Sequence, residues 1–158
     1  MESALHNDHA LENILHDLIR MHKESAEAYS KAAHQLRRNE ELRLLCEEFA
    51  EDSDLFADEL RTILISEYPY ITHQPKPMVY HPRTTPYTTF STQDVHSVLH
   101  TCVSGEETML HAYQEALSFC RNKHADMHTA LADQAEALYE ACEELKSFRQ
   151  VAALKHAV

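Results

Sequence analysis

The sequence predicts an all-helical fold: a four-helix bundle made of two antiparallel helical hairpins that a long crossover joins. The 158 residues fit one domain and include a single glycine, whereas sheet proteins need glycine in their tight turns. Apolar residues recur at intervals of three and four in four long stretches, the spacing of one helix face. All five prolines lie between Tyr68 and Phe90, so they divide the chain into two helical halves.

The first half, residues 8–67, predicts one hairpin. Its first helix covers about residues 8–37, and Asn39, followed by two glutamates, is typical of a cap that starts a second helix. The residues on the inner face of the first helix are Leu11, Leu15, Leu18, His22, Ser25, Tyr29, Ala32 and Leu36. Those on the inner face of the second are Leu42, Leu45, Phe49, Asp52, Phe56, Leu60 and Ile63.

The second half, residues 93–152, predicts a similar hairpin that starts near Asp94, with Asn122 expected to cap its second helix. The inner residues of its first helix are Val95, Val98, Cys102, Glu106, Met109, Tyr113, Ala116 and Cys120. Those of the last helix are His128, Leu131, Ala135, Leu138, Cys142, Leu145 and Phe148. An offset of 84 aligns residues 28–32 with 112–116, which suggests an internal repeat.

The crossover, residues 68–92, is long enough to run the height of the bundle. A chain of that length reaches up to ~80 Å when extended, while a helix of about 27 residues is only ~40 Å long. We therefore expect the third helix to run parallel to the second. A linker between two independent hairpins is the alternative, although a lone hairpin buries little apolar surface. The tyrosines of the crossover are expected to pack along an outer groove, with docking of a partner as the alternative.

Charge and cysteine usage limit the class of protein. The formal charge is −12, and the sequence shows no basic stripe of the kind that binds nucleic acid. No apolar run is long enough to span a membrane and no signal peptide is visible, so we expect a cytoplasmic protein without a membrane partner. The four cysteines form no CxxC pair, and we expect reduced, mostly buried thiols.

Three stretches carry a resemblance to a known family: residues 22–33, residues 105–117 with their Gly105-Glu106 pair ahead of Tyr113, and residues 131–134. They resemble a bacterial ferritin-like family of unknown function, distantly related to ferritin and rubrerythrin. The resemblance implies a ferritin-like fold and a suspected association with stress, and no particular activity. Family members usually carry Gly-Glu in the first helix too, where we match Ser25 and Ala26.

An ordinary ferritin-like di-iron site needs Glu-x-x-His from two helices, and no glutamate here has histidine three positions later. Polar residues nevertheless interrupt the inner faces near mid-helix. They are His22, Ser25, Asp52, Glu106 and Gln134. Because a buried carboxylate needs a partner, two interpretations stay open. One is a hydrogen-bonded polar layer of Glu106, His22 and Gln134. The other is a metal site with Glu106, Asp52 and His22 as ligands for iron, manganese or zinc.

These observations predict a non-catalytic, stress-associated helical-bundle protein with a polar layer at mid-bundle, for which we also consider a homodimer. The alternative is a metal-binding protein with a degenerate ferritin-like centre; a redox enzyme is disfavoured. Histidines at i, i+4, such as His96 with His100 and His124 with His128, can chelate a cation on a helix surface. We expect most of them to be solvated instead.

Overall fold

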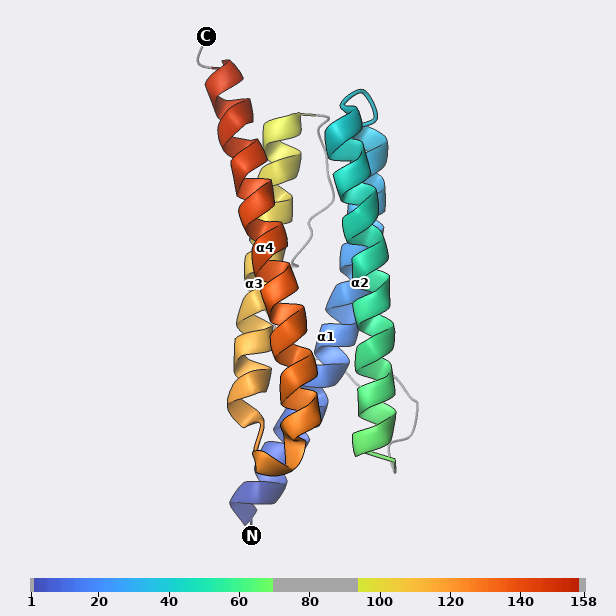
Figure 1. Cartoon of the computed structure of the whole chain (residues 1–158), viewed down its shortest axis with the longest axis vertical. Coiled ribbons are helices and arrows are strands. Elements are labelled where there is room, and N and C mark those ends of the chain that lie inside the picture. The colour runs from blue at the N-terminus through green and yellow to red at the C-terminus, as the bar shows by residue number, and fades with distance from the viewer. Residues whose placement is uncertain (1, 70–93, 157–158) are drawn as a thin grey trace.

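The computed structural model describes residues 2–69 and 94–156, with side chains for residues 6–69 and 94–154. These residues form four long helices and no strand (Figure 1), which confirms the predicted all-helical class. The helices are α1 (Glu2–Gln35), α2 (Glu40–Glu67), α3 (Val95–Phe119) and α4 (Ala125–His156), with a short 3-10 turn, η1 (Asn122–His124), before α4. The predictions made for residues 70–92 of the crossover lie outside the described residues.

Short polar side chains fix the starts of two helices. The backbone N–H of Leu42 donates to Asn39 Oδ1 at 3.2 Å, which confirms the predicted cap of α2. Asp94 caps α3 in the same way, accepting from the N–H of Ser97 at 3.3 Å. The prediction for α4 was wrong, because Asn122 begins the 3-10 turn rather than capping the helix.

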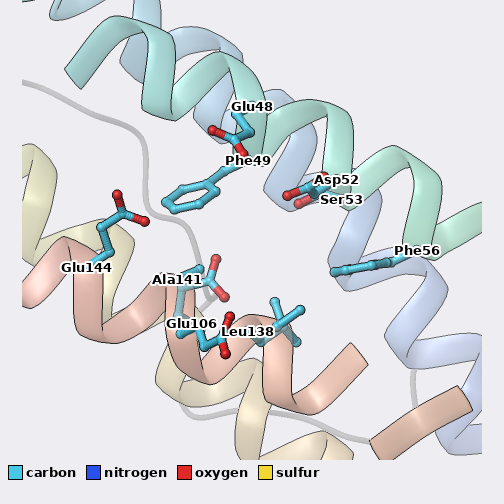
Figure 2. Close-up of a pocket in the computed structure, with 11 residues that line it drawn as sticks. Glu48, Phe49, Asp52, Ser53, Phe56, Glu106, Leu138, Ala141 and Glu144 are labelled. Carbon is cyan, nitrogen blue, oxygen red and sulfur yellow. The ribbon is translucent and has the colours of Figure 1, made fainter. Parts of the chain in front are cut away.

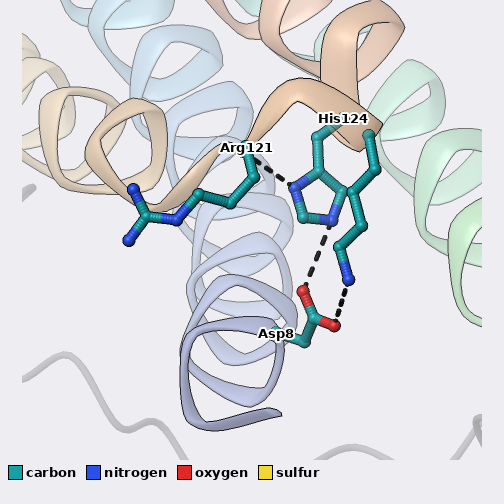
Figure 3. A network of polar contacts seen from close by, with 4 residues as sticks. Asp8, Arg121 and His124 are labelled. Atoms are coloured by element: carbon teal, nitrogen blue, oxygen red, sulfur yellow. Dashed lines mark hydrogen bonds and ion pairs between the residues drawn. The ribbon is translucent and has the colours of Figure 1, made fainter. Parts of the chain in front are cut away.

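The α3–α4 connection is anchored to the start of α1 by Asp8 (Figure 3). Lys123 Nζ lies 2.6 Å from one carboxylate oxygen of Asp8, and His124 Nε2 lies 3.4 Å from the other. The N–H of Arg121 donates to His124 Nδ1 at 3.1 Å. His124 is buried and holds this corner of the bundle together, so the expectation of a solvated histidine was wrong there.

The contacts between helices fix their directions. Tyr29 on α1 bonds to Glu106 on α3, and His22 bonds to Tyr113, so residue numbers fall along α1 as they rise along α3. The helix α1 is therefore antiparallel to α3, and it is also antiparallel to α2 within its hairpin. It follows that α2 and α3 run in the same direction (Figure 1), as the reach of the crossover predicts.

The apolar core consists of two clusters, one toward each end of the bundle. The cluster nearest the α1–α2 turn contains Ala32, Leu36, Leu42, Cys46, Phe49, Val98, Cys102, Cys142 and Leu145, among others. The cluster toward the opposite end contains Leu11, Leu15, Leu18, Met21, Leu60, Met109, Met127 and Leu131, among others. Each large apolar side chain in them contributes about 1.5–3 kcal/mol through burial. The candidate site lies where the two clusters meet.

Three of the four cysteines, Cys46, Cys102 and Cys142, are buried within the first cluster, and all four are free thiols, as expected. Burial raises the pKa of Cys46 to about 12, and a neighbouring glutamate, Glu47, adds to the shift. These thiols therefore behave as small apolar side chains. Within the described residues, no helix combines the length and the apolar character needed to cross a membrane.

Candidate functional site

A layer of buried polar side chains separates the two apolar clusters. His22, Ser25, Ser53, Glu106 and Gln134 are each at most 4% exposed. They come from all four helices. Two fully buried tyrosines, Tyr29 and Tyr113, supply the hydroxyl groups that connect most of them. Four of the five polar residues predicted near mid-helix are thus buried, and the fifth, Asp52, is partly exposed.

Tyr113 lies at the centre of a hydrogen-bond chain. Its hydroxyl donates to Gln134 Oε1 at 2.6 Å and lies 2.6 Å from His22 Nε2. Since the hydroxyl has only one proton to donate, it accepts from His22, which assigns the imidazole proton to Nε2. Gln134 Nε2 in turn donates to Glu59 Oε2 at 2.7 Å. The chain leads from the core through Gln134 to Glu59, which is exposed on α2.

His22 is a neutral imidazole at the buried end of this chain. It has no exposed surface, and burial lowers its pKa to about 3. Its ring meets those of Phe56 and Tyr113 edge-on, with centroids 5.6 and 5.8 Å away. Its Nδ1 has no hydrogen-bond partner among the described residues.

Tyr29 forms the second half of the layer. Its hydroxyl donates to Glu106 Oε1 at 2.5 Å, a short bond of the kind expected for a carboxylate acceptor. Glu106 is only 1% exposed, so the bond compensates part of the cost of burying its charge. The ring of Phe49 packs edge-on against Tyr29, with centroids 5.4 Å apart.

The two halves of the layer are related by the internal repeat. The offset of 84 that pairs Tyr29 with Tyr113 also pairs His22 with Glu106. Tyr29 of α1 bonds to Glu106 of α3, and Tyr113 of α3 bonds to His22 of α1. The contacts therefore put His22, rather than Ser25 or Ala26, in the place equivalent to Glu106. Ser25 bonds instead to Ser53 of α2, Oγ to Oγ at 3.0 Å.

The structure brings together two of the three predicted metal ligands. Glu106 and Asp52 line a pocket of about 190 Å³ between α2 and α4, together with Glu48, Glu140 and Glu144 (Figure 2). His22 does not line this pocket. Within the part of the chain that is described, no group of three or more histidine, cysteine, aspartate or glutamate side chains is placed to hold a metal ion.

The carboxylates of this pocket crowd one another. Burial raises the pKa of Asp52, and the nearby charges of Glu48 and Glu51 raise it further. Hard carboxylate oxygens of this kind suit magnesium, manganese or ferrous iron. The carboxylates of the pocket therefore favour a cation, whereas His22 lies outside the pocket.

A second pocket, of about 560 Å³, lies farther along the same two helices. It is lined by Phe56, Glu59, Thr62, Ile63, Ala130, Asp133 and Gln134. Phe56 lines both pockets, so they form one groove between α2 and α4.

The sequence reasoning missed two features of the site: the central roles of Tyr29 and Tyr113, and the contribution of Glu59. The repeat at offset 84 was the available signal for the tyrosines, because it aligns them with each other. No protein-family model matches this chain, and a search of curated proteins finds no relative.

Proposed function

We propose that this chain is a non-catalytic, ferritin-like helical-bundle protein whose buried polar layer sets the register of the helices. One observation carries the proposal. Two polar atoms of the layer that come from different helices, His22 Nε2 and Glu106 Oε1, are both hydrogen-bonded to tyrosine hydroxyls. Buried polar networks with matched donors and acceptors favour one packing arrangement over its alternatives. The association with stress comes from the family resemblance alone.

The second candidate function is a metal-binding protein that holds iron, manganese or zinc. It is supported by the pocket in which Glu106 and Asp52 lie with three further carboxylates. In that case Glu106 and Asp52 would be ligands, and His22, which does not line this pocket, would have to move to join them.

Metal content of the untagged protein tests both candidates. We would measure it by mass spectrometry for the wild type, Glu106→Gln and the matched control Glu107→Gln, whose side chain is exposed on the next residue of α3. The non-catalytic proposal expects metal well below one ion per chain in all three proteins. Near-stoichiometric metal that is lost in Glu106→Gln and kept in Glu107→Gln would overturn it and support the second candidate.

Oxidation of ferrous iron by oxygen tests for the activity expected of a ferritin-like centre. The proposal expects the same rate with and without the protein. A faster rate that depends on Glu106, with Glu107→Gln unchanged, would establish catalysis and reject the proposal.

A further inference from the structure

One side of the bundle is open. The pairs α1–α2, α3–α4 and α1–α3 pack closely, whereas α2 and α4 make few contacts. The two pockets lie between these helices and share Phe56. Along α2 the groove extends from Glu48 to Ile63, which at about 1.5 Å per residue is roughly 22 Å.

The groove has an apolar floor and acidic edges. Its apolar lining residues are Phe49, Phe56, Ile63, Ala130, Ala137, Leu138 and Ala141. Its carboxylates are Glu48, Asp52 and Glu59 on α2, Glu106 on α3, and Asp133, Glu140 and Glu144 on α4. Lysine, arginine and histidine are absent from both sets of lining residues. Among the residues that the structure describes, no basic side chain of the lining neutralises these charges.

We propose that this groove is the docking site for a basic amphipathic helix of a partner protein. A helix of about 15 residues matches the ~22 Å length, and its apolar stripe would cover the partly exposed Phe56, Ile63 and Ala141. Lysine or arginine residues flanking that stripe would face the carboxylates of both edges, which gives charge complementarity along the whole groove. The inference rests on the proposed function, in which the protein is not a catalyst.

Charge decides against a second copy of this chain as the occupant. Two grooves placed face to face would bring carboxylates against carboxylates, and like charges in contact cost several kcal/mol. A cationic helix has the opposite effect. Its charges would offset the repulsion of Glu48 and Glu51, which adds to burial in raising the pKa of Asp52.

The test uses a synthetic peptide, because the partner is unidentified. The probe is a fluorescein-labelled, acetylated 16-residue helix with leucine and alanine on one face and lysine on the other. Its control is a peptide of the same composition with the leucines scrambled around the helix. Fluorescence anisotropy would measure the Kd of each peptide for the wild type. We expect the amphipathic peptide to bind at least ten times more tightly than the scrambled one.

Variants of α4 locate the binding. The double variant Glu140→Lys/Glu144→Lys reverses two groove charges, and Glu136→Lys/Glu143→Lys makes the same charge change on exposed residues that do not line the groove. We expect the first to weaken binding at least tenfold and the second less than threefold. Ala137→Trp fills the groove without changing its charge and should also weaken binding tenfold. Circular dichroism melts would show that each variant folds.

Equal weakening by both charge-reversed variants, or equal binding of both peptides, would overturn the groove assignment, since attraction to overall charge would then explain the data. Selective binding of a free divalent cation in place of the peptide would overturn it as well. These outcomes are distinct from failure of the proposed function, which appears as metal that depends on Glu106 or as ferrous iron oxidation.

Discussion

Replacing Tyr113 by phenylalanine removes one oxygen atom from the centre of the polar layer. That oxygen accepts from His22 Nε2 and donates to Gln134 Oε1. Both partners are buried, at 0% and 2% exposure, so neither gains a bond to water when the hydroxyl is lost. The variant therefore leaves an imidazole N–H and an amide oxygen in the core with no partner at this position.

The size of the effect follows from these two groups. A buried polar atom left without its partner costs about 1–3 kcal/mol, so two such atoms cost about 2–6 kcal/mol. The ring itself is kept, and no cavity larger than the oxygen is created. For a chain of this length the loss corresponds to a fall in Tm of roughly 4–24 °C.

Urea unfolding followed by circular dichroism measures this loss. Tyr139→Phe is the matched control, because Tyr139 is 58% exposed and should change the free energy of unfolding by less than about 0.5 kcal/mol. The double variant with Gln134→Leu removes one of the two orphaned groups. It should therefore show a coupling energy of about 0.5–3 kcal/mol with Tyr113→Phe. A Tyr113→Phe protein as stable as Tyr139→Phe would refute the claim that the layer holds the bundle together.

Three further predictions follow from the same layer and core. Ser25→Ala or Ser53→Ala alone should cost about 1 kcal/mol in urea unfolding, while the double variant should cost little more, because it leaves no buried hydroxyl without its partner. Burial lowers the pKa of His22 to about 3, so between pH 6 and 3 the unfolded chain binds the proton that the native state does not. His22 should therefore contribute a loss of about 1.4 kcal/mol in unfolding free energy for each unit that the pH falls, and urea titrations at several pH values should show a shallower slope for His22→Phe. Native protein treated with a thiol reagent should react first at the partly exposed Cys120, and the other three cysteines should react only on unfolding; rapid native labelling of all four would contradict their burial.

Much of the fold could be predicted because it depends on local and periodic features. The stripe from Leu11 to Leu36 and the cap at Asn39 both appear in the structure as expected, since each reflects residues close together in the sequence. Asn122 misled the prediction because the side chain of His124 satisfies the backbone N–H of Arg121 instead. That choice depends on Asp8, which is distant in the sequence.

The candidate site was harder to predict because helical periodicity gives the side on which a residue lies but not the atom to which it bonds. Glu106, His22 and Gln134 were expected in one layer, and the structure buries all three, with His22 and Gln134 joined through Tyr113 and Glu106 bonded to Tyr29. To predict their bonds to the two tyrosine hydroxyls, one would need to know how far α1 is shifted along the bundle axis relative to α3. The sequence does not contain this shift. Asp52 has an inward position in the heptad-like stripe yet faces the groove, because α2 and α4 stand apart.

The two halves of the repeat differ at one position of the layer, where His22 of α1 is equivalent to Glu106 of α3. This difference explains how the layer can be stable without a cation. A layer that followed the repeat in chemistry would carry a second carboxylate in place of His22. Each of two buried carboxylates would lose several kcal/mol of hydration, a cost that a bound metal normally offsets. The neutral imidazole of His22 removes one of these charges while keeping a donor for Tyr113. The carboxylate of Glu106 accepts a hydrogen bond from Tyr29. Histidine rather than a carboxylate at this one position therefore supports the proposed hydrogen-bonded layer more than the alternative of a metal centre.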